Sequence, residues 1–137
     1  MNPHPDQAIL ETVLGALKRD QFLSSFVGID NISDYFKDDA GYPRVRIGAV
    51  RTSDYSSHTH TGFRGTLTVE TYTQQRGRWQ CQRIMDGIYQ IINNSDNLDL
   101  KFYYFLDIRL SDNAIMDEGD GITRNGIQSF DFILGVK

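Results

Sequence analysis

An alternation of apolar and polar side chains in the last third of this 137-residue chain limits its fold more than any other feature. Within residues 100–110, every second position is apolar: Leu100, Phe102, Tyr104, Leu106, Ile108 and Leu110. Within residues 122–136, a second run places on one face Gln128, Phe130, Phe132, Leu134 and Val136. Successive side chains of a strand point to opposite faces, so this period predicts two strands that each bury one face. The acidic segment 117–121 between them is expected to form a turn.

Two further strands are predicted in the middle of the chain. Residues 44–51 alternate between a basic or small face and an apolar face that contains Val45, Ile47 and Ala49. Residues 63–73 alternate in the same way, with one face formed by Leu67, Val69 and Thr71. The segment 54–62 between them contains no aliphatic side chain, which predicts a long hairpin with a mobile loop that is available for function. Residues 29–35 indicate one more short strand, and the polar segment 37–41 a turn.

Two helices are predicted from apolar residues at helical spacing. Residues 6–19 place on one face Ile9, Leu10, Val13, Leu14 and Leu17. Residues 78–93 do the same with Cys81, Ile84, Met85, Ile88 and Ile92. The order helix, strands, helix, strands favours a single α+β domain over residues 1–137: a mostly antiparallel sheet with two helices packed on one face.

Composition and charge narrow the function classes. The single cysteine excludes an internal disulfide, and the chain shows neither a signal peptide nor an apolar run long enough to span a membrane, so we expect a soluble protein made in a cytoplasm. Residues 44–83 carry seven arginines against Asp54 and Glu70, whereas both flanking segments are acidic. These charges either intermingle on one folded surface or form patches of opposite sign that would suit head-to-tail packing in a ring.

Candidate catalytic and metal-binding residues do not form a recognisable site. His58 and His60 would share one face of a strand, but no further ligand follows at a metal-binding spacing, which favours two solvated histidines. The acidic turn departs from the calcium-loop pattern in its glycine positions and has no closing glutamate. Cys81 lies on an apolar helix face without a nearby histidine, as expected for a buried structural thiol. The sequence therefore predicts no catalytic residues, no metal and no cofactor.

A cluster of arginines surrounds the single tryptophan at the start of the second helix: Arg76, Arg78, Trp79 and Arg83. Such a cluster is compatible with nucleic-acid binding, with a solvated helix start, or with a protein–protein hot spot. The acidic flanks would repel a phosphate backbone. The protein contact is therefore the favoured interpretation.

The sequence resembles the small tail-terminator or tail-completion proteins of long-tailed phages and gene transfer agents. Four features carry this resemblance in order along nearly the whole chain. They are an N-terminal helix that ends in the apolar stretch 17–27, an aromatic-Pro strand entry at residues 42–48, a strand at 65–72 that leads through a polar turn into a helix with Ile84, Ile88 and Ile92, and an acidic turn into the final strand at 120–132. The loop with His58 and His60 has no match to the family's pattern.

This resemblance implies a structural virion protein without enzymatic activity. It would form a hexameric ring that caps the tail tube at its head-proximal end and provides the surface for head joining. The implied partners are other copies of the chain, the tail tube protein and a neck or head-completion protein, with DNA only as passing cargo and no membrane. We hypothesise a subunit interface at Arg76, Arg78, Trp79 and Arg83, and a loop that contacts a neighbouring protein through Asp54, Tyr55, His58, His60 and Phe63.

Three other functions are compatible with the sequence. A neck or head-completion protein would have a similar build, and the order of neighbouring genes would separate it from a terminator. A small metal-dependent hydrolase or nuclease would use His58, His60 and the acidic turn, and would bind metal stoichiometrically. A peptide-binding module would present the edge of the hairpin as a stable monomer.

Overall fold

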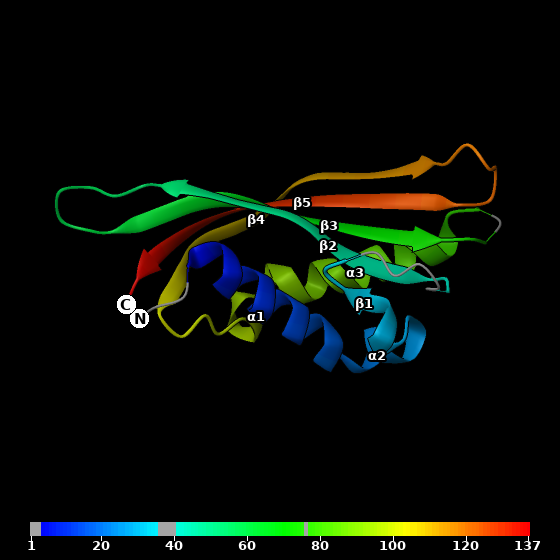
Figure 1. Ribbon diagram of the computed structural model, residues 1–137, viewed down its shortest axis with the longest axis horizontal. Helices are drawn as coiled ribbons and strands as arrows, with labels where there is room; N and C mark the ends of the chain where they lie inside the picture. Colours follow the sequence, from blue (N-terminus) through cyan, green and yellow to red (C-terminus); the bar gives the residue numbers. More distant parts are fainter. Residues whose placement is uncertain (1–3, 36–40, 76) are drawn as a thin grey trace.

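The computed structural model describes residues 4–35, 41–75 and 77–137. It has two layers, a long twisted sheet and a layer of helices that covers one of its faces, while the other face stays open (Figure 1). The helices are α1 (Pro5–Arg19), α2 (Gln21–Phe26) and α3 (Trp79–Asn93), with two short 3-10 turns at Ile29–Asn31 and Ser95–Asn97. The strands are β1 (Ile32–Ser33), β2 (Arg44–Asp54), β3 (Gly62–Thr73), β4 (Tyr103–Asp117) and β5 (Arg124–Val136).

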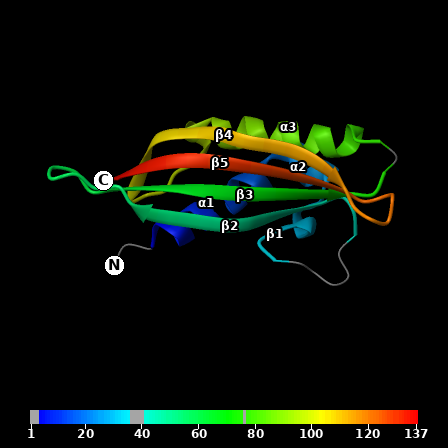
Figure 2. The same cartoon turned by 90° about the horizontal axis from the view of Figure 1, so that it is seen from above.

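The five strands are ordered β1-β2-β3-β5-β4, so that β4 forms one edge of the sheet and β1 with β2 forms the other. All pairs are antiparallel except β1 with β2, which is parallel and joins only two residue pairs. Two long hairpins, β2–β3 and β4–β5, extend to opposite ends of the molecule (Figure 1). Figure 2 views the molecule from the open face of the sheet. The helices lie behind the sheet in this view, α1 on the β2 side and α3 on the β4 side.

The core fills the space between the helices and the covered face of the sheet. Helix α3 buries Cys81, Ile84, Met85, Ile88, Ile91 and Ile92 against that face. Strand β5 contributes Phe130, Phe132 and Leu134, each at most 2% exposed. At Gly65 a Cβ atom would lie 2.8 Å from the ring of Phe132, so the glycine lets this ring pack directly over the backbone of β3.

The predicted α+β class is confirmed, and the predicted helices and the strands β2, β3 and β5 appear within a few residues of their expected bounds. Strand β4 differs more, because it begins at Tyr103 and continues to Asp117, seven residues beyond the predicted end. The helix layer contains one more helix than predicted, because Asp20 caps a short α2 by accepting from the backbone N–H of Leu23. The expected short strand within 29–35 is a 3-10 turn followed by β1. The expected turn at 37–41 lies outside the described residues except for Gly41.

Two β-bulges correct the predicted burial pattern. In β2, Gly48 and Ala49 lie opposite the single residue Thr68, so Val50 packs against the core and Ala49 is exposed. In β4, Leu106 is an extra residue between the pairs Phe105–Leu134 and Asp107–Ile133. As a result Tyr104 and Leu106, predicted to be buried, are 41% and 61% exposed. A bulge moves every later side chain to the opposite face, which simple alternation does not reveal.

Candidate functional site

The predicted arginine–tryptophan cluster lies at the start of α3, beside the edge strand β4. Trp79 is 67% exposed, and its ring packs edge-on against Phe26 with 6.2 Å between centroids. The guanidinium of Arg83 lies 4.8 Å above the ring of Phe22. Arg78 pairs with Asp117 at 3.3 Å, although both side chains are more than half exposed. Arg76 lies outside the described residues.

These side chains border a groove between α3 and β4, here called the Trp79 groove. Its volume is about 570 Å³ and it is lined by Arg78, Trp79, Gln82, Arg83, Asp86, Asn113, Ala114 and Ile115. An exposed indole with an aromatic backing and two neighbouring guanidinium groups has the composition of a protein–protein hot spot. The structure thus brings Arg78, Trp79 and Arg83 together on one surface.

The second predicted contact region, the β2–β3 loop, comprises residues 55–61 and projects beyond the rest of the molecule (Figure 1). Backbone hydrogen bonds close it, from Tyr55 N–H to the Gly62 carbonyl at 2.9 Å and from Ser57 N–H to the His60 carbonyl at 2.8 Å. Tyr55 is 54% exposed, and His58 and His60 are exposed as well. Each of these side chains is therefore available to a neighbouring protein.

Two other residues of this hypothesis lie at the base of the loop. Phe63 packs edge-on against Tyr103, with 6.1 Å between ring centroids, and belongs to the margin of the core. Asp54 accepts a hydrogen bond from the Ser56 hydroxyl at 2.6 Å. Phe63 therefore supports the hairpin and does not share the exposed surface of Tyr55, His58 and His60.

The carboxylates of the acidic turn bind groups of the turn itself and of neighbouring residues. The hydroxyl and backbone N–H of Thr123 and the N–H of Ile122 donate to Asp120, which holds the pKa of this carboxyl below its usual value. Asp117 pairs with Arg124 at 3.2 Å as well as with Arg78. Within the part of the chain that the structure describes, no three His, Cys, Asp or Glu side chains are grouped so as to hold a metal ion.

Two buried or partly buried groups have raised pKa values. Burial raises the pKa of the Cys81 thiol, whose residue is 0% exposed, so the expectation of a buried structural thiol is confirmed. Burial, together with a hydrogen bond to Glu70, raises the pKa of Tyr72 to about 12. Both groups are protonated at neutral pH.

No helix of the described chain has the length and apolarity needed to cross a membrane.

A groove between α1 and β2, here called the acidic groove, was not predicted from the sequence. Its volume is about 500 Å³ and it is lined by Asp6, Gln7, Leu10, Glu11, Leu14, Asp34, Ile47, Gly48 and Val50. Leu10 and Leu14 belong to the predicted apolar stripe of the first helix, but both are only partly buried. The available signal for this groove was the apolar stripe of the first helix, which is wider than the neighbouring sheet can cover.

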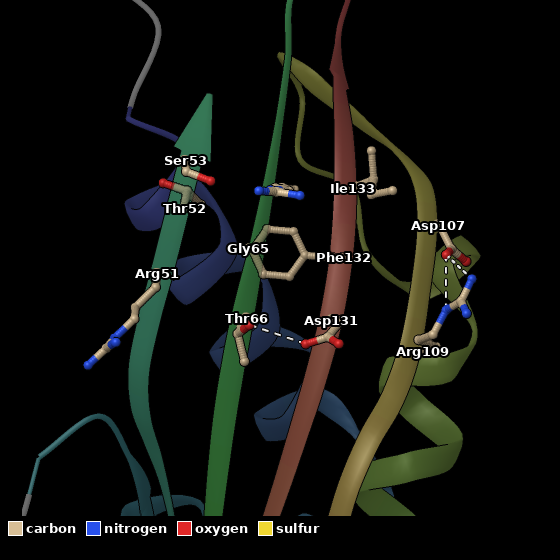
Figure 3. Close-up of a pocket in the computed structure, with 11 residues that line it drawn as sticks. Arg51, Thr52, Ser53, Gly65, Thr66, Asp107, Arg109, Asp131, Phe132 and Ile133 are labelled. Atoms are coloured by element: carbon tan, nitrogen blue, oxygen red, sulfur yellow. Dashed lines mark hydrogen bonds and ion pairs between the residues drawn. The ribbon is translucent and has the colours of Figure 1, made fainter. Parts of the chain in front are cut away.

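The open face of the sheet carries a shallow depression that sequence reasoning also missed (Figure 3). Arg51 of β2 and Arg64 of β3 are among its lining residues, and Asp131 accepts from Thr66 at 3.2 Å. On β4, Arg109 pairs with Asp107. The Arg51 side chain has no carboxylate partner among the described residues. The alternation of arginines with buried residues in β2 was the available signal.

Comparison with known proteins finds a matching family model and matching solved structures. A family model described as "Tail completion protein gp17" matches residues 11–135. A chain from a solved structure, the virion of a native gene transfer agent particle, matches with a TM-score of 0.83 and 15% sequence identity, covering 97% of this chain and 99% of that chain. At this identity the structural likeness shows the fold alone. No curated protein sequence matches the chain.

Proposed function

The chain belongs to the gp17 family of tail completion proteins, and from this we propose that it caps the tail tube of a phage or gene transfer agent as a hexameric ring. The ring would lie at the head-proximal end of the tail and provide the surface to which a filled head attaches. The family match over residues 11–135 is the observation that carries this proposal. The match of the whole fold to a chain of a gene transfer agent virion supports it.

The proposed role is structural, without catalysis. The partners would be further copies of the chain, the tail tube protein and a neck or head-completion protein, with DNA passing through the ring. The protein would be made in the host cytoplasm and end in the virion. The exposed Trp79 and its arginines support a subunit interface on the α3 side, because a desolvated Trp and Arg cluster is the usual centre of a protein contact.

The proposal is tested by electron microscopy of particles made without this gene. Headless tails of excessive or irregular length are expected, because nothing would stop the tube or prepare it for joining. Supplying the gene from a plasmid should restore joined particles. Normal tails beside empty heads would instead assign the protein to the neck, and intact infectious particles would contradict both roles.

The β2–β3 loop supplies a second prediction, that deleting Ser56–His60 abolishes contact with the neighbouring tail or neck protein. The deletion leaves Tyr55 and Thr61 as a two-residue connection between β2 and β3, a length that antiparallel hairpins accommodate. The fold should therefore persist while joined particles are lost, as counted by electron microscopy. The matched control replaces the same five residues with Gly and Ser, which keeps the length of the loop but removes the side chains of His58, Thr59 and His60. Unchanged assembly with the deletion would contradict the assignment.

A further inference from the structure

The Trp79 groove and the acidic groove lie on opposite sides of the molecule. The Trp79 groove is bordered by the edge strand β4, and the acidic groove by β2 at the other edge of the sheet. Figure 2 shows α3 beside β4 and α1 beside β2, on the two sides of the sheet's long axis. Two different surfaces on opposite sides are what a head-to-tail contact between identical subunits requires.

The two grooves carry opposite charge. Among the described residues, the acidic groove is lined by the three carboxylates of Asp6, Glu11 and Asp34 and by no basic side chain. The Trp79 groove is lined by Arg78 and Arg83 and by one carboxylate, that of Asp86. Glu11, Asp34 and Arg83 each lack an ion-pair partner among the described residues. A contact between the two grooves would pair these charges.

The sheet layer shows the reverse arrangement of charge. Strands β2 and β3 carry four arginines against two acidic residues, whereas β4 and β5 carry two arginines against four aspartates. The β2 side is thus acidic in the helix layer and basic in the sheet layer, and the β4 side is the opposite. Charges match in both layers only if neighbouring subunits place their helices on the same face. This pattern therefore selects one relative orientation.

The apolar groups of the two grooves also complement one another. Trp79 projects into solvent at the rim of its groove, whereas Leu10, Leu14 and Val50 line the acidic groove and are only partly buried. A tryptophan buries roughly 150–250 Å² when it is enclosed, which makes it an effective anchor. The acidic groove provides aliphatic side chains for the indole and carboxylates for the arginines beside it.

We propose that Trp79, with Arg78 and Arg83 beside it at the Trp79 groove of one copy, docks into the acidic groove of the next copy. This inference rests on the proposed ring and names the surface that receives the arginine–tryptophan cluster. The contact is heterologous, so each copy uses one groove toward each neighbour, and the series forms the proposed ring when the rotation between neighbours closes. The occupant of the acidic groove is thus a second copy of this chain.

Charge reversal with mixing tests this docking in a producing strain that lacks the chromosomal gene. One plasmid encodes Glu11→Arg with Asp34→Arg, and the other encodes Arg78→Glu with Arg83→Glu. Each variant alone brings like charges together at every contact, and we expect at least about a tenfold loss of joined particles. Both variants together should restore particles. In an alternating ring, one contact is wild type on both surfaces and the next has both charges exchanged.

The charge-matched control is Arg19→Glu with Lys137→Glu, two exposed residues that line neither groove, and it should assemble normally. Recovery by mixing shows at the same time that both reversed chains fold. Normal assembly by either reversed variant alone, or no recovery on mixing, would overturn the docking. Intact particles without the gene would instead remove the proposed function, so the two failures are distinguishable.

Thiol crosslinking tests the same contact without changing charge. Gln82 lines the Trp79 groove, Gln7 lines the acidic groove, and both side chains are exposed. A chain with Gln7→Cys and Gln82→Cys in assembled particles should give covalent multimers after treatment with a short thiol crosslinker. Chains with either substitution alone should give no covalent multimers, because the native Cys81 is buried and cannot take part in crosslinking. Joined particles that yield no multimers from the double variant would refute the docking.

Discussion

Particles made with a chain that carries both Arg78→Glu and Trp79→Ala are expected to have open, unjoined tails. Truncating a hot-spot residue costs roughly 2 kcal/mol or more, which is about a thirtyfold loss of affinity at one contact. A closed ring repeats this contact between every pair of neighbours, so the loss recurs around the ring. Electron microscopy of the assembled particles, and the size of the purified protein's complexes, would measure the effect.

Folding should change little in this double variant. Arg78 pairs with Asp117 on an exposed surface, and such a pair contributes about 0–1 kcal/mol. Trp79 is 67% exposed, and its ring packs edge-on against the partly buried Phe26. The control, Arg19→Glu with Phe102→Ala, makes the same charge change and also removes a partly exposed aromatic ring, away from both grooves. Normal rings in the double variant would exclude this interface.

Replacing Phe130 with alanine is expected to lower the free energy of unfolding by about 3–5 kcal/mol. Phe130 is 0% exposed in the centre of β5, where it lies opposite Leu67 of β3 and Leu110 of β4. Its removal would leave a cavity bounded by three strands, which cannot close without breaking the register of the sheet. Urea denaturation followed by circular dichroism would measure the change.

Phe102→Ala is the matched control for this loss of a phenyl ring. Phe102 is 38% exposed and lies just before β4, so its removal leaves no enclosed cavity. We expect a change of about 1 kcal/mol or less, as is usual for surface positions. Equal losses for the two variants would mean that β5 does not form the centre of the core.

Local patterns predicted most of the elements, since helical and strand periods are properties of neighbouring residues. The stripe of α3 and the buried face of β5 are read directly from spacing, and the structure confirms both. The prediction that Ala49, Tyr104 and Leu106 are buried was wrong, because each lies at or beside a bulge or register shift. A bulge depends on how two distant strands pair, and the sequence of one strand does not contain that information.

The candidate surfaces divide in the same way. Arg78, Trp79 and Arg83 are neighbours in the chain, so their cluster could be predicted from the helix alone. Asp6, Glu11 and Asp34 converge on one groove only because α1 packs beside β2 and because β1, which directly precedes Asp34, pairs with the same strand. Phe63 was grouped with the exposed loop by its position in the chain, whereas its packing against Tyr103 sets it apart.

The sequence by itself determined the class of the fold, the resemblance to tail completion proteins and the position of the tryptophan cluster. Each of these follows from periodicity or from residues close together in the chain. Only the tertiary structure decided that the two grooves lie at opposite edges of the sheet with opposite charge. That arrangement depends on the strand order β1-β2-β3-β5-β4, in which β5 pairs with β3 and leaves β4 at the edge. Strand order is set by the packing of the whole chain, which no local pattern encodes.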